Sequence, residues 1–260
     1  METSSQRPPV GQIERAMLVI RVLASAGARG VPLSGLADVT RLAPSTVHRL
    51  LTKLIRERVV RQVADSRCYA LGPVVYELGL AAARQFDMRA ICRPAVERLA
   101  HEAGDTVYVV IRSGDEAVCI DRQEGPSPIR VLTLQPGSRR PLGLGAGGLA
   151  ILAHLPDDER ASVLAVVTPI IVRQYQFPAR ALRDSLEVAR REGVALIRNR
   201  VTAGVTAIGM PFRDTLGHCL GAVSMAGINA RMTQARVDAI KPLLATAVRE
   251  IERSIARRVD

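Results

Sequence analysis

Aromatic residues are scarce in this chain of 260 residues, which has no Trp, three Phe and four Tyr. Its cores must therefore rest on Leu, Ile, Val and Ala. Platforms that stack single-stranded nucleic acid need several aromatic rings, so that class of binding protein is disfavoured. Hydrophobic residues make up 48% of the chain and charged residues 23%, which is ordinary for a globular protein and excludes wholesale disorder.

Cysteine is also sparse. The four cysteines, Cys68, Cys92, Cys119 and Cys219, are far apart and form no CxxC pair, so we expect neither a disulfide framework nor a metal site. No apolar run approaches the roughly 20 residues that span a bilayer. The N-terminal residues contain no apolar secretory signal. We therefore expect a cytoplasmic protein with no membrane contact.

No catalytic motif is visible. His101, His154 and His218 are isolated, and the chain has no HExxH motif and no Ser-His-Asp order. The run Gly143–Gly148 matches GxGxxG, but Arg-Arg-Pro precedes it in place of a strand, and no acidic residue follows about 20 positions later. We therefore predict no enzyme and no cofactor. The backbone N–H groups of this loop could hold a carboxylate, or its glycines could serve only tight helix packing.

Positive charge is abundant, with 36 basic against 25 acidic residues. Residues 1–86 carry 12 basic and 6 acidic groups, and residues 41–67 alone carry seven basic and two acidic groups. Such an excess favours a polyanionic partner, either nucleic acid or an anionic membrane surface. Charge alone would equally fit a solvated basic face without a partner.

The first 72 residues have the pattern of a winged helix-turn-helix. Apolar residues recur at helical spacing from Ile13 to Ala24, and a second short helix is expected with Ser34 as its N-cap. A turn then leads to a third helix with Pro44 in its first turn. Strand-like runs at 59–63 and 68–71 bracket a turn sequence. Three helices followed by a basic hairpin are typical of a winged DNA-binding domain.

A connecting helix is expected at 73–84, and the rest of the chain predicts an α+β domain with a largely antiparallel sheet. Hairpins and helices alternate there, and no internal repeat is visible. The expected strand pairs are 106–112 with 117–122, and 205–212 with 218–225. Helices are expected at 91–103, after the Gly-rich stretch 137–148, from 157 onward, at 180–192 and at 234–258.

Short sequence words in a fixed order resemble the IclR family of regulators. They are Glu14–Ala16, Leu42–Leu51, Tyr69–Gly72, Gly137–Leu142, Ala146–Ala150, Gly193–Ala195, Gly204–Val205 and Ala222–Met225. The resemblance implies a winged helix-turn-helix DNA-binding domain at 1–72, a connecting helix at 73–86 and a GAF-like or profilin-like α+β effector domain at 87–260. It also implies a homodimer or dimer of dimers that binds a double-stranded DNA operator and a small organic effector, often a carboxylate.

The chain departs from the family pattern at several positions. Gly143, Gly145 and Leu149 replace the usual His, Thr and Lys, and Asn199–Arg200 replaces an acidic pair. Arg41 stands where the family often has Gly, and Ala43–Pro44 replaces Pro-Lys. These changes bear on the identity of the effector more than on DNA binding.

The third helix is expected to carry the main DNA contacts. Arg49 lies opposite its apolar stripe, so it could contact a guanine with two hydrogen bonds or clamp a phosphate; otherwise it is a surface residue. His48 fits a structural or peripheral role better. The predicted DNA-binding residues are Arg41, Ser45, Thr46, His48, Arg49, Lys53, Arg61 and Arg67.

The family resemblance places effector contacts at Ile129, Leu132, Arg140, Ala146, Gly147, Ile197, Val205, Ala207, Ser224 and Ala226. Most of these side chains are apolar, so we predict a hydrophobic pocket with one anchor for an anion, suited to an aromatic or branched acid. For Ile129, Leu132 and Val205 a simple core role fits nearly as well. We predict a transcriptional regulator, more often a repressor; the alternatives are an activator of catabolic genes or a DNA-associated regulator without a ligand.

Overall fold

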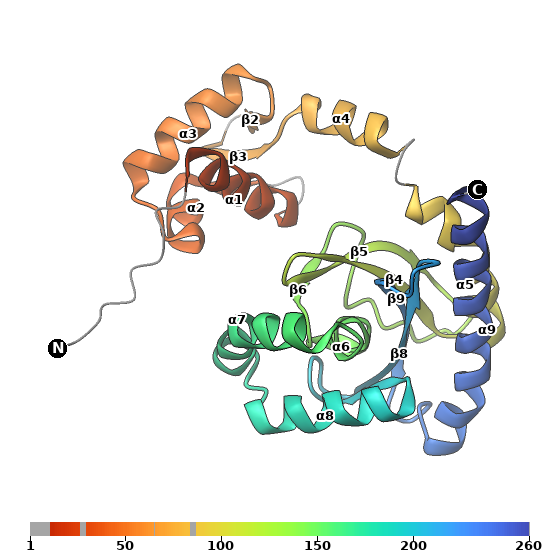
Figure 1. Cartoon of the computed structure of the whole chain (residues 1–260). Helices are drawn as coiled ribbons and strands as arrows, with labels where there is room; N and C mark the ends of the chain where they lie inside the picture. The colour runs from red at the N-terminus through yellow and green to blue at the C-terminus, as the bar shows by residue number, and fades with distance from the viewer. Residues whose placement is uncertain (1–10, 27–29, 65, 84–86, 260) are drawn as a thin grey trace. The chain divides into compact units, whose positions relative to one another are not determined.

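The computed structural model describes residues 11–26, 30–64, 66–83 and 87–259 (Figure 1). The chain divides into two units, Met1–Asp87 and Met88–Asp260, each with its own apolar core. The division falls one residue after the expected start of the second domain.

The first unit packs three helices around one apolar cluster and closes them with a small antiparallel sheet of order β1-β3-β2. Val19 and Leu23 of the first helix meet Val47 and Leu51 of the third in this cluster. The elements are α1 (Gln12–Ser25), β1 (Val31–Pro32), α2 (Leu33–Thr40), α3 (Pro44–Arg56), β2 (Val60–Gln62), β3 (Cys68–Leu71) and α4 (Pro73–Ala83). The predicted winged helix-turn-helix is confirmed.

Two local details differ from the sequence prediction. Ser34 is not an N-cap, because α2 already begins at Leu33, with Pro32 in the capping position and no side-chain capping bond. The short strand β1 was not predicted, since two residues offer no alternation to recognise. Asp65, within the turn predicted between the two strand-like runs, and Arg84, at the end of the predicted connecting helix, lie outside the described residues.

The second unit is built on a six-stranded antiparallel sheet of order β6-β5-β4-β9-β8-β7. The two predicted hairpins are its four central strands, and the edge strands β6 and β7 were not predicted. In chain order the elements are α5 (Met88–Ala103), β4 (Thr106–Ser113), β5 (Glu116–Gln123), β6 (Arg139–Pro141), α6 (Gly145–Ala153), α7 (Asp157–Tyr175), α8 (Ala179–Glu192), β7 (Ala195–Arg198), β8 (Val205–Arg213), β9 (Cys219–Ile228) and α9 (Gln234–Val259). The α+β class is confirmed.

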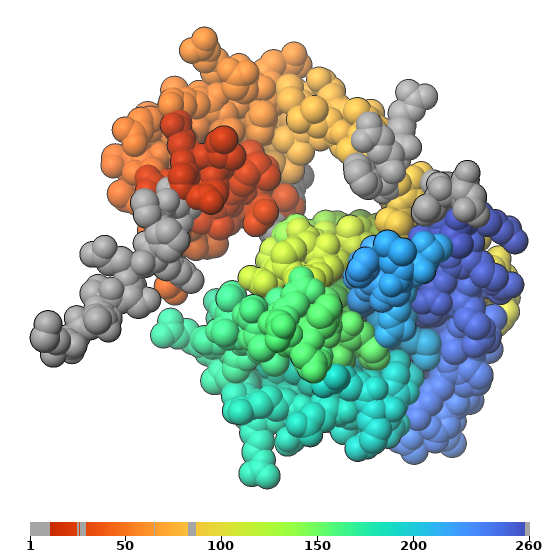
Figure 2. Space-filling model, in the orientation of Figure 1, coloured from red at the N-terminus to blue at the C-terminus, as the bar shows by residue number. Residues whose placement is uncertain are grey.

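Helices cover both faces of this sheet. Helices α5 and α9 lie on one face and helices α6, α7 and α8 on the other (Figure 1). Strand β4 shows why: Val107 and Val109 belong to the α5–α9 core, while Tyr108 and Val110 belong to the α6–α8 core. In the space-filling view the cyan residues of α8 lie at the lower surface of the unit and the blue residues of α9 at its right-hand surface (Figure 2).

The residues at two helix ends of the second unit are suited to those positions. Helix α7 begins with Asp157, Asp158 and Glu159, whose negative charges are stabilised by the positive end of the helix dipole. Helix α8 is capped by Gly193, which adopts the left-handed conformation with φ of 68°. None of the helices in the described ranges is long and apolar enough to cross a membrane.

Candidate functional site

The third helix of the first unit presents a polar face to solvent. Val47, Leu50 and Leu51 are buried in the core. At about 100° per residue, the direction opposite this stripe is occupied by Ser45, Arg49, Thr52 and Arg56, all exposed. An exposed polar helix face carrying several basic residues is what a DNA groove requires.

The other predicted DNA-binding residues surround this face. Thr46 and Lys53 lie on one flank of α3, and His48 lies on the opposite flank; its peripheral role stays a prediction. Arg41 caps α2 in the left-handed region with φ of 55°. Arg61 in β2 and Arg67 before β3 are exposed on the wing hairpin. The structure therefore places all eight residues in the first unit, and their contact with DNA stays a prediction.

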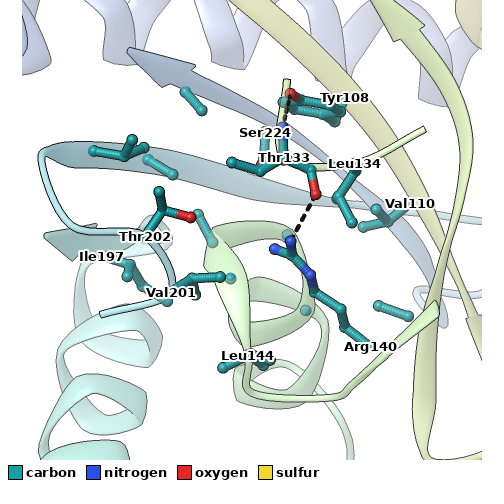
Figure 3. Close-up of a pocket in the computed structure, with 18 residues that line it drawn as sticks. Tyr108, Val110, Thr133, Leu134, Arg140, Leu144, Ile197, Val201, Thr202 and Ser224 are labelled. Atoms are coloured by element: carbon teal, nitrogen blue, oxygen red, sulfur yellow. Dashed lines mark hydrogen bonds between the residues drawn. The ribbon is translucent and has the colours of Figure 1, made fainter. Parts of the chain in front are cut away.

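A cavity in the second unit opens between the start of α6 and the α6-facing side of the sheet (Figure 3). Its enclosed volume is about 50 Å³, and the empty space rises to about 630 Å³ only when the open mouth is included. Small-molecule sites usually measure about 300–1,000 Å³, so a ligand here must extend into the mouth or displace lining side chains. The lining residues come from β4, β5, β6, α6, β7, β8, β9 and the loops at 133–134 and 201–202.

Arg140 is the charged residue of this cavity. It extends from the edge strand β6, and its Nη2 donates a hydrogen bond of 2.7 Å to the carbonyl oxygen of Thr133 (Figure 3). Burial lowers the pKa of Arg140 below its ordinary value, but an arginine stays protonated at neutral pH. Within the described ranges no carboxylate pairs with it. The wall therefore contains a cation without a counter-ion.

Four residues with hydroxyl groups line the cavity: Tyr108, Thr133, Thr202 and Ser224. The Tyr108 hydroxyl is already engaged: it donates to the carbonyl of Val131 and accepts from the backbone N–H of Thr133 at 3.1 Å. Burial raises the pKa of Tyr108, so the phenol stays neutral and fixes the 131–134 segment as a wall. Ser224, buried on β9, and Thr202, in the loop before β8, line the cavity (Figure 3). They can orient a polar group of a ligand.

The glycines at the start of α6 bring backbone and sheet close together. A Cβ atom at Gly147 would lie 2.6 Å from Cγ2 of Val110 and 3.3 Å from Oγ of Ser224. Gly145, with φ of 75°, lies beside the Nη1 atom of Arg140. Tight packing is thus one role of these glycines. Their N–H groups also begin a helix at the cavity wall, where a carboxylate would be stabilised.

Eight of the ten predicted effector positions line this cavity: Arg140, Ala146, Gly147, Ile197, Val205, Ala207, Ser224 and Ala226. Ile129 and Leu132 do not. Their side chains are 53% and 52% exposed, because the segment before β6 turns them outward. Leu144, Gly145 and Gly148 also line the cavity; they belong to the run Gly143–Gly148, whose backbone N–H groups were expected to be able to hold a carboxylate. Sequence reasoning missed the other lining residues, which had no local signal: Tyr108, Val110, Ala117, Thr133, Leu134, Val201 and Thr202.

The described residues contain no cluster that could bind a metal ion and no pair of cysteines in a disulfide. No group of three or more His, Cys, Asp or Glu there could hold a metal ion. The four cysteines are unpaired. Burial raises the pKa of Cys92 to about 12 and that of Cys119 to about 11, so neither is a reactive thiolate.

Both parts of the chain match families of known proteins. Residues 12–64 match the IclR helix-turn-helix domain, and residues 80–253 match the bacterial transcriptional regulator IclR C-terminal domain. The transcriptional regulator BhcR of Paracoccus denitrificans is 28% identical over 249 residues, which cover 95% of this chain and 88% of that protein. The transcriptional repressor AllR of Escherichia coli K12 is 28% identical over 264 residues, covering 96% and 94%.

Solved structures show the same fold. An IclR transcriptional regulator from Silicibacter sp. TM1040 superposes with a TM-score of 0.82 at 24% identity, covering 94% of this chain and 96% of that one. An IclR homologue from Microbacterium hydrocarbonoxydans, complexed with 4-hydroxybenzoate, gives 0.69 at 22% identity, covering 96% and 100%. These families consist of regulators and not of enzymes. The chain belongs to the IclR family of bacterial transcriptional regulators, with a helix-turn-helix domain and a C-terminal effector domain.

Proposed function

We propose that this regulator represses transcription from an operator and that a small hydrophobic carboxylic acid, bound in the cavity of the second unit, changes its affinity for DNA. The relative AllR is named a repressor, and the IclR homologue from Microbacterium hydrocarbonoxydans was solved with 4-hydroxybenzoate. Both support the proposal. Activation of catabolic genes remains the alternative sign of regulation.

The observation that carries the proposal is the guanidinium of Arg140. It lies in a largely apolar cavity, its one hydrogen bond goes to a backbone carbonyl, and the described residues supply no carboxylate to neutralise it. A half-buried charge without a counter-ion is unfavourable, so an anionic ligand that pairs with it gains a charge-assisted hydrogen bond. The apolar walls at Ile197, Val205 and Ala207 suit the ligand's hydrocarbon body.

In this proposal the DNA contacts are made by the eight predicted residues of the first unit, with α3 in the major groove. The domains run over 1–72, 73–86 and 87–260. The protein acts in the cytoplasm as a homodimer or dimer of dimers, because two half-sites read by two copies give the affinity that one winged helix lacks.

The test compares thermal unfolding of wild type and Arg140→Met with benzoate, 4-hydroxybenzoate and the uncharged analogue benzamide. A ligand at 100 times its Kd stabilises the folded state by about 2.7 kcal/mol. We expect the acids to raise the Tm of wild type, benzamide to raise it much less, and Arg140→Met to lose the difference. Arg130→Met is the matched control, since Arg130 is exposed and outside the cavity.

Operator binding is measured alongside, on a duplex selected from a random-sequence library with the full-length protein. An acid that raises the Tm should also change the affinity for this duplex, through unequal binding to the two states of the regulator. Equal responses of wild type and Arg140→Met to the acids would contradict the anchoring role. Selective DNA binding with no response to any acid would favour a regulator without such a ligand.

A further inference from the structure

Arg15, in the first turn of α1, has a buried group that the fold leaves unsatisfied. Its Nε atom is buried and has no hydrogen-bond partner in the described part of the chain. The neighbouring carboxylate of Glu14 instead accepts a bond from the backbone N–H of Gly11. A buried donor without an acceptor is costly, so a guanidinium whose Nε is buried without a partner needs a reason.

The surroundings of Arg15 supply one. A cleft between α1 and α3 is lined by Gln12, Arg15, Thr46, Arg49, Leu50 and Lys53. Three of these side chains are cations, two are polar and uncharged, and none is acidic. Like charges this close repel one another unless an anion lies between them. The cleft therefore has the composition of an anion site that the protein does not fill by itself.

Its position on α3 indicates which anion. Arg49 lies near the centre of the exposed face of α3, whereas Lys53 and Thr46 lie about 40° and 60° from it around the helix, toward α1. When a recognition helix enters the major groove, its outward face meets the bases and its flanks meet the sugar-phosphate backbone. The cleft occupies such a flank.

We propose that this cleft holds one backbone phosphate of the bound DNA, with Arg15 as its innermost ligand and Lys53 at its rim, while Arg49 points toward the bases. This inference rests on the DNA binding described above and adds a residue that sequence reasoning did not select. A guanidinium can donate two parallel hydrogen bonds to a phosphate, which fixes the depth and orientation of the helix in the groove. Arg15 then contributes affinity and position but carries no base information.

The experiment measures binding of the full-length protein to two fluorescent duplexes over a range of salt concentrations. One is a random-sequence duplex and the other is the duplex obtained by selection. Each phosphate contact contributes about 0.9 to the slope of log K against log salt concentration. We expect Arg15→Met to lower the slope by about that amount per DNA-bound protomer on both duplexes, with the preference between them unchanged.

Two further variants make the result specific. Arg15→Lys keeps the charge and should retain most of the slope. Arg180→Met removes one positive charge from a side chain that is 93% exposed on α8 of the other unit, and should leave the slope as in wild type. Thermal unfolding of each variant shows whether the first unit still folds.

Each outcome is decisive. An unchanged slope in folded Arg15→Met overturns the proposal, and a loss of preference at constant slope assigns a base contact and overturns it as well. If Arg15→Met does not fold, the test instead uses selected duplexes that each carry one neutral methylphosphonate in place of a phosphate. Wild type and Arg15→Lys should then both lose affinity when the same phosphate is replaced. If no such position exists, the phosphate site is refuted. Should wild type bind no duplex at all, DNA binding itself fails, and not only this inference.

Discussion

Gly147 and Gly148 are neighbours in the first turn of α6, yet a methyl group would meet very different surroundings at each. At Gly147 the added Cβ atom would lie 2.6 Å from Cγ2 of Val110, closer than real Cβ contacts. At Gly148 the shortest distance is 3.5 Å, to Cβ of Ala117 and to the backbone nitrogen of Gly143, which is ordinary contact. The two substitutions to Ala therefore form a matched pair.

The expected magnitudes follow from these distances. Replacing a helical Gly by Ala stabilises a helix by about 0.5–1 kcal/mol, and both variants share that gain. The contact at Gly147 opposes it, because Val110 is β-branched, 3% exposed and held in the central strand β4. Overpacking of this kind costs about 1–3 kcal/mol. We expect Gly147→Ala to be about 2 kcal/mol less stable than Gly148→Ala.

Thermal and urea unfolding of both variants provide the measurement. For a domain of this size about 2 kcal/mol corresponds to a difference in Tm of about 4–8 °C. Gly147→Ala should also respond less to 4-hydroxybenzoate, since Val110 and Ser224 both line the cavity. Equal stabilities would refute the packing argument. A bulky replacement such as Gly147→Leu is a poorer probe of the ligand site, because it would disturb packing and binding together.

Two other predictions concern Arg49 on the exposed face of α3 and the buried carboxylate of Asp121 on β5. Arg49→Ala should leave the fold intact, because the Arg49 side chain is exposed. It should cost about 1–3 kcal/mol of base discrimination, measured at fixed salt as a smaller ratio of the affinities for the selected and the random duplex. An unchanged ratio would show that Arg49 does not contact a base. Asp121 is 1% exposed; burial raises the pKa of its carboxyl, but hydrogen bonds from Arg93 and Gln123 and the charge of Arg89 outweigh this and hold it below its ordinary value. A carboxyl whose pKa is lowered in the folded state stabilises the fold above its unfolded pKa of about 3.9, and this stabilisation is lost as the pH falls through the folded value. By urea unfolding, Asp121→Asn should therefore cost about 1–3 kcal/mol of stability at pH 7 and much less at pH 3. An equal loss of stability at both pH values would contradict this.

The elements that sequence predicted well are those with a strong pattern of their own. The third helix has its apolar residues on one stripe and Pro44 at its start, and the structure has α3 at Pro44–Arg56. The four long strands also stood out: β4 is rich in β-branched residues, and each pair of apolar runs is joined by a short turn sequence. The edge strands β1, β6 and β7 are two to four residues long and depend on a neighbouring strand for their conformation. Local sequence contains too little information to predict them.

The cavity could be predicted only in part, for a related reason. Strand β4 is apolar on both faces, so alternation does not tell which of Tyr108 and Val109 faces α6. That choice depends on the sheet order, in which β4 lies beside β9 although more than 100 residues separate them. Leu132 and Thr133 are adjacent, yet only Thr133 lines the cavity, because its neighbourhood is fixed by the hydroxyl of Tyr108.

The structure explains the departures from the family pattern at Leu149, Gly143 and Gly145. Leu149, where the family usually has Lys, is fully buried in the α6–α8 core, so a charge there would be unfavourable. Gly143 and Gly145 adopt φ of 91° and 75°, and neither offers a polar side chain to the cavity. The polar groups at the cavity are then backbone N–H groups, the guanidinium of Arg140 and the hydroxyls of Thr133, Thr202 and Ser224, besides the engaged hydroxyl of Tyr108. A loop that has lost its polar side chains beside an unpaired arginine favours an effector whose anionic end is bound by Arg140 and whose remaining surface is mostly apolar.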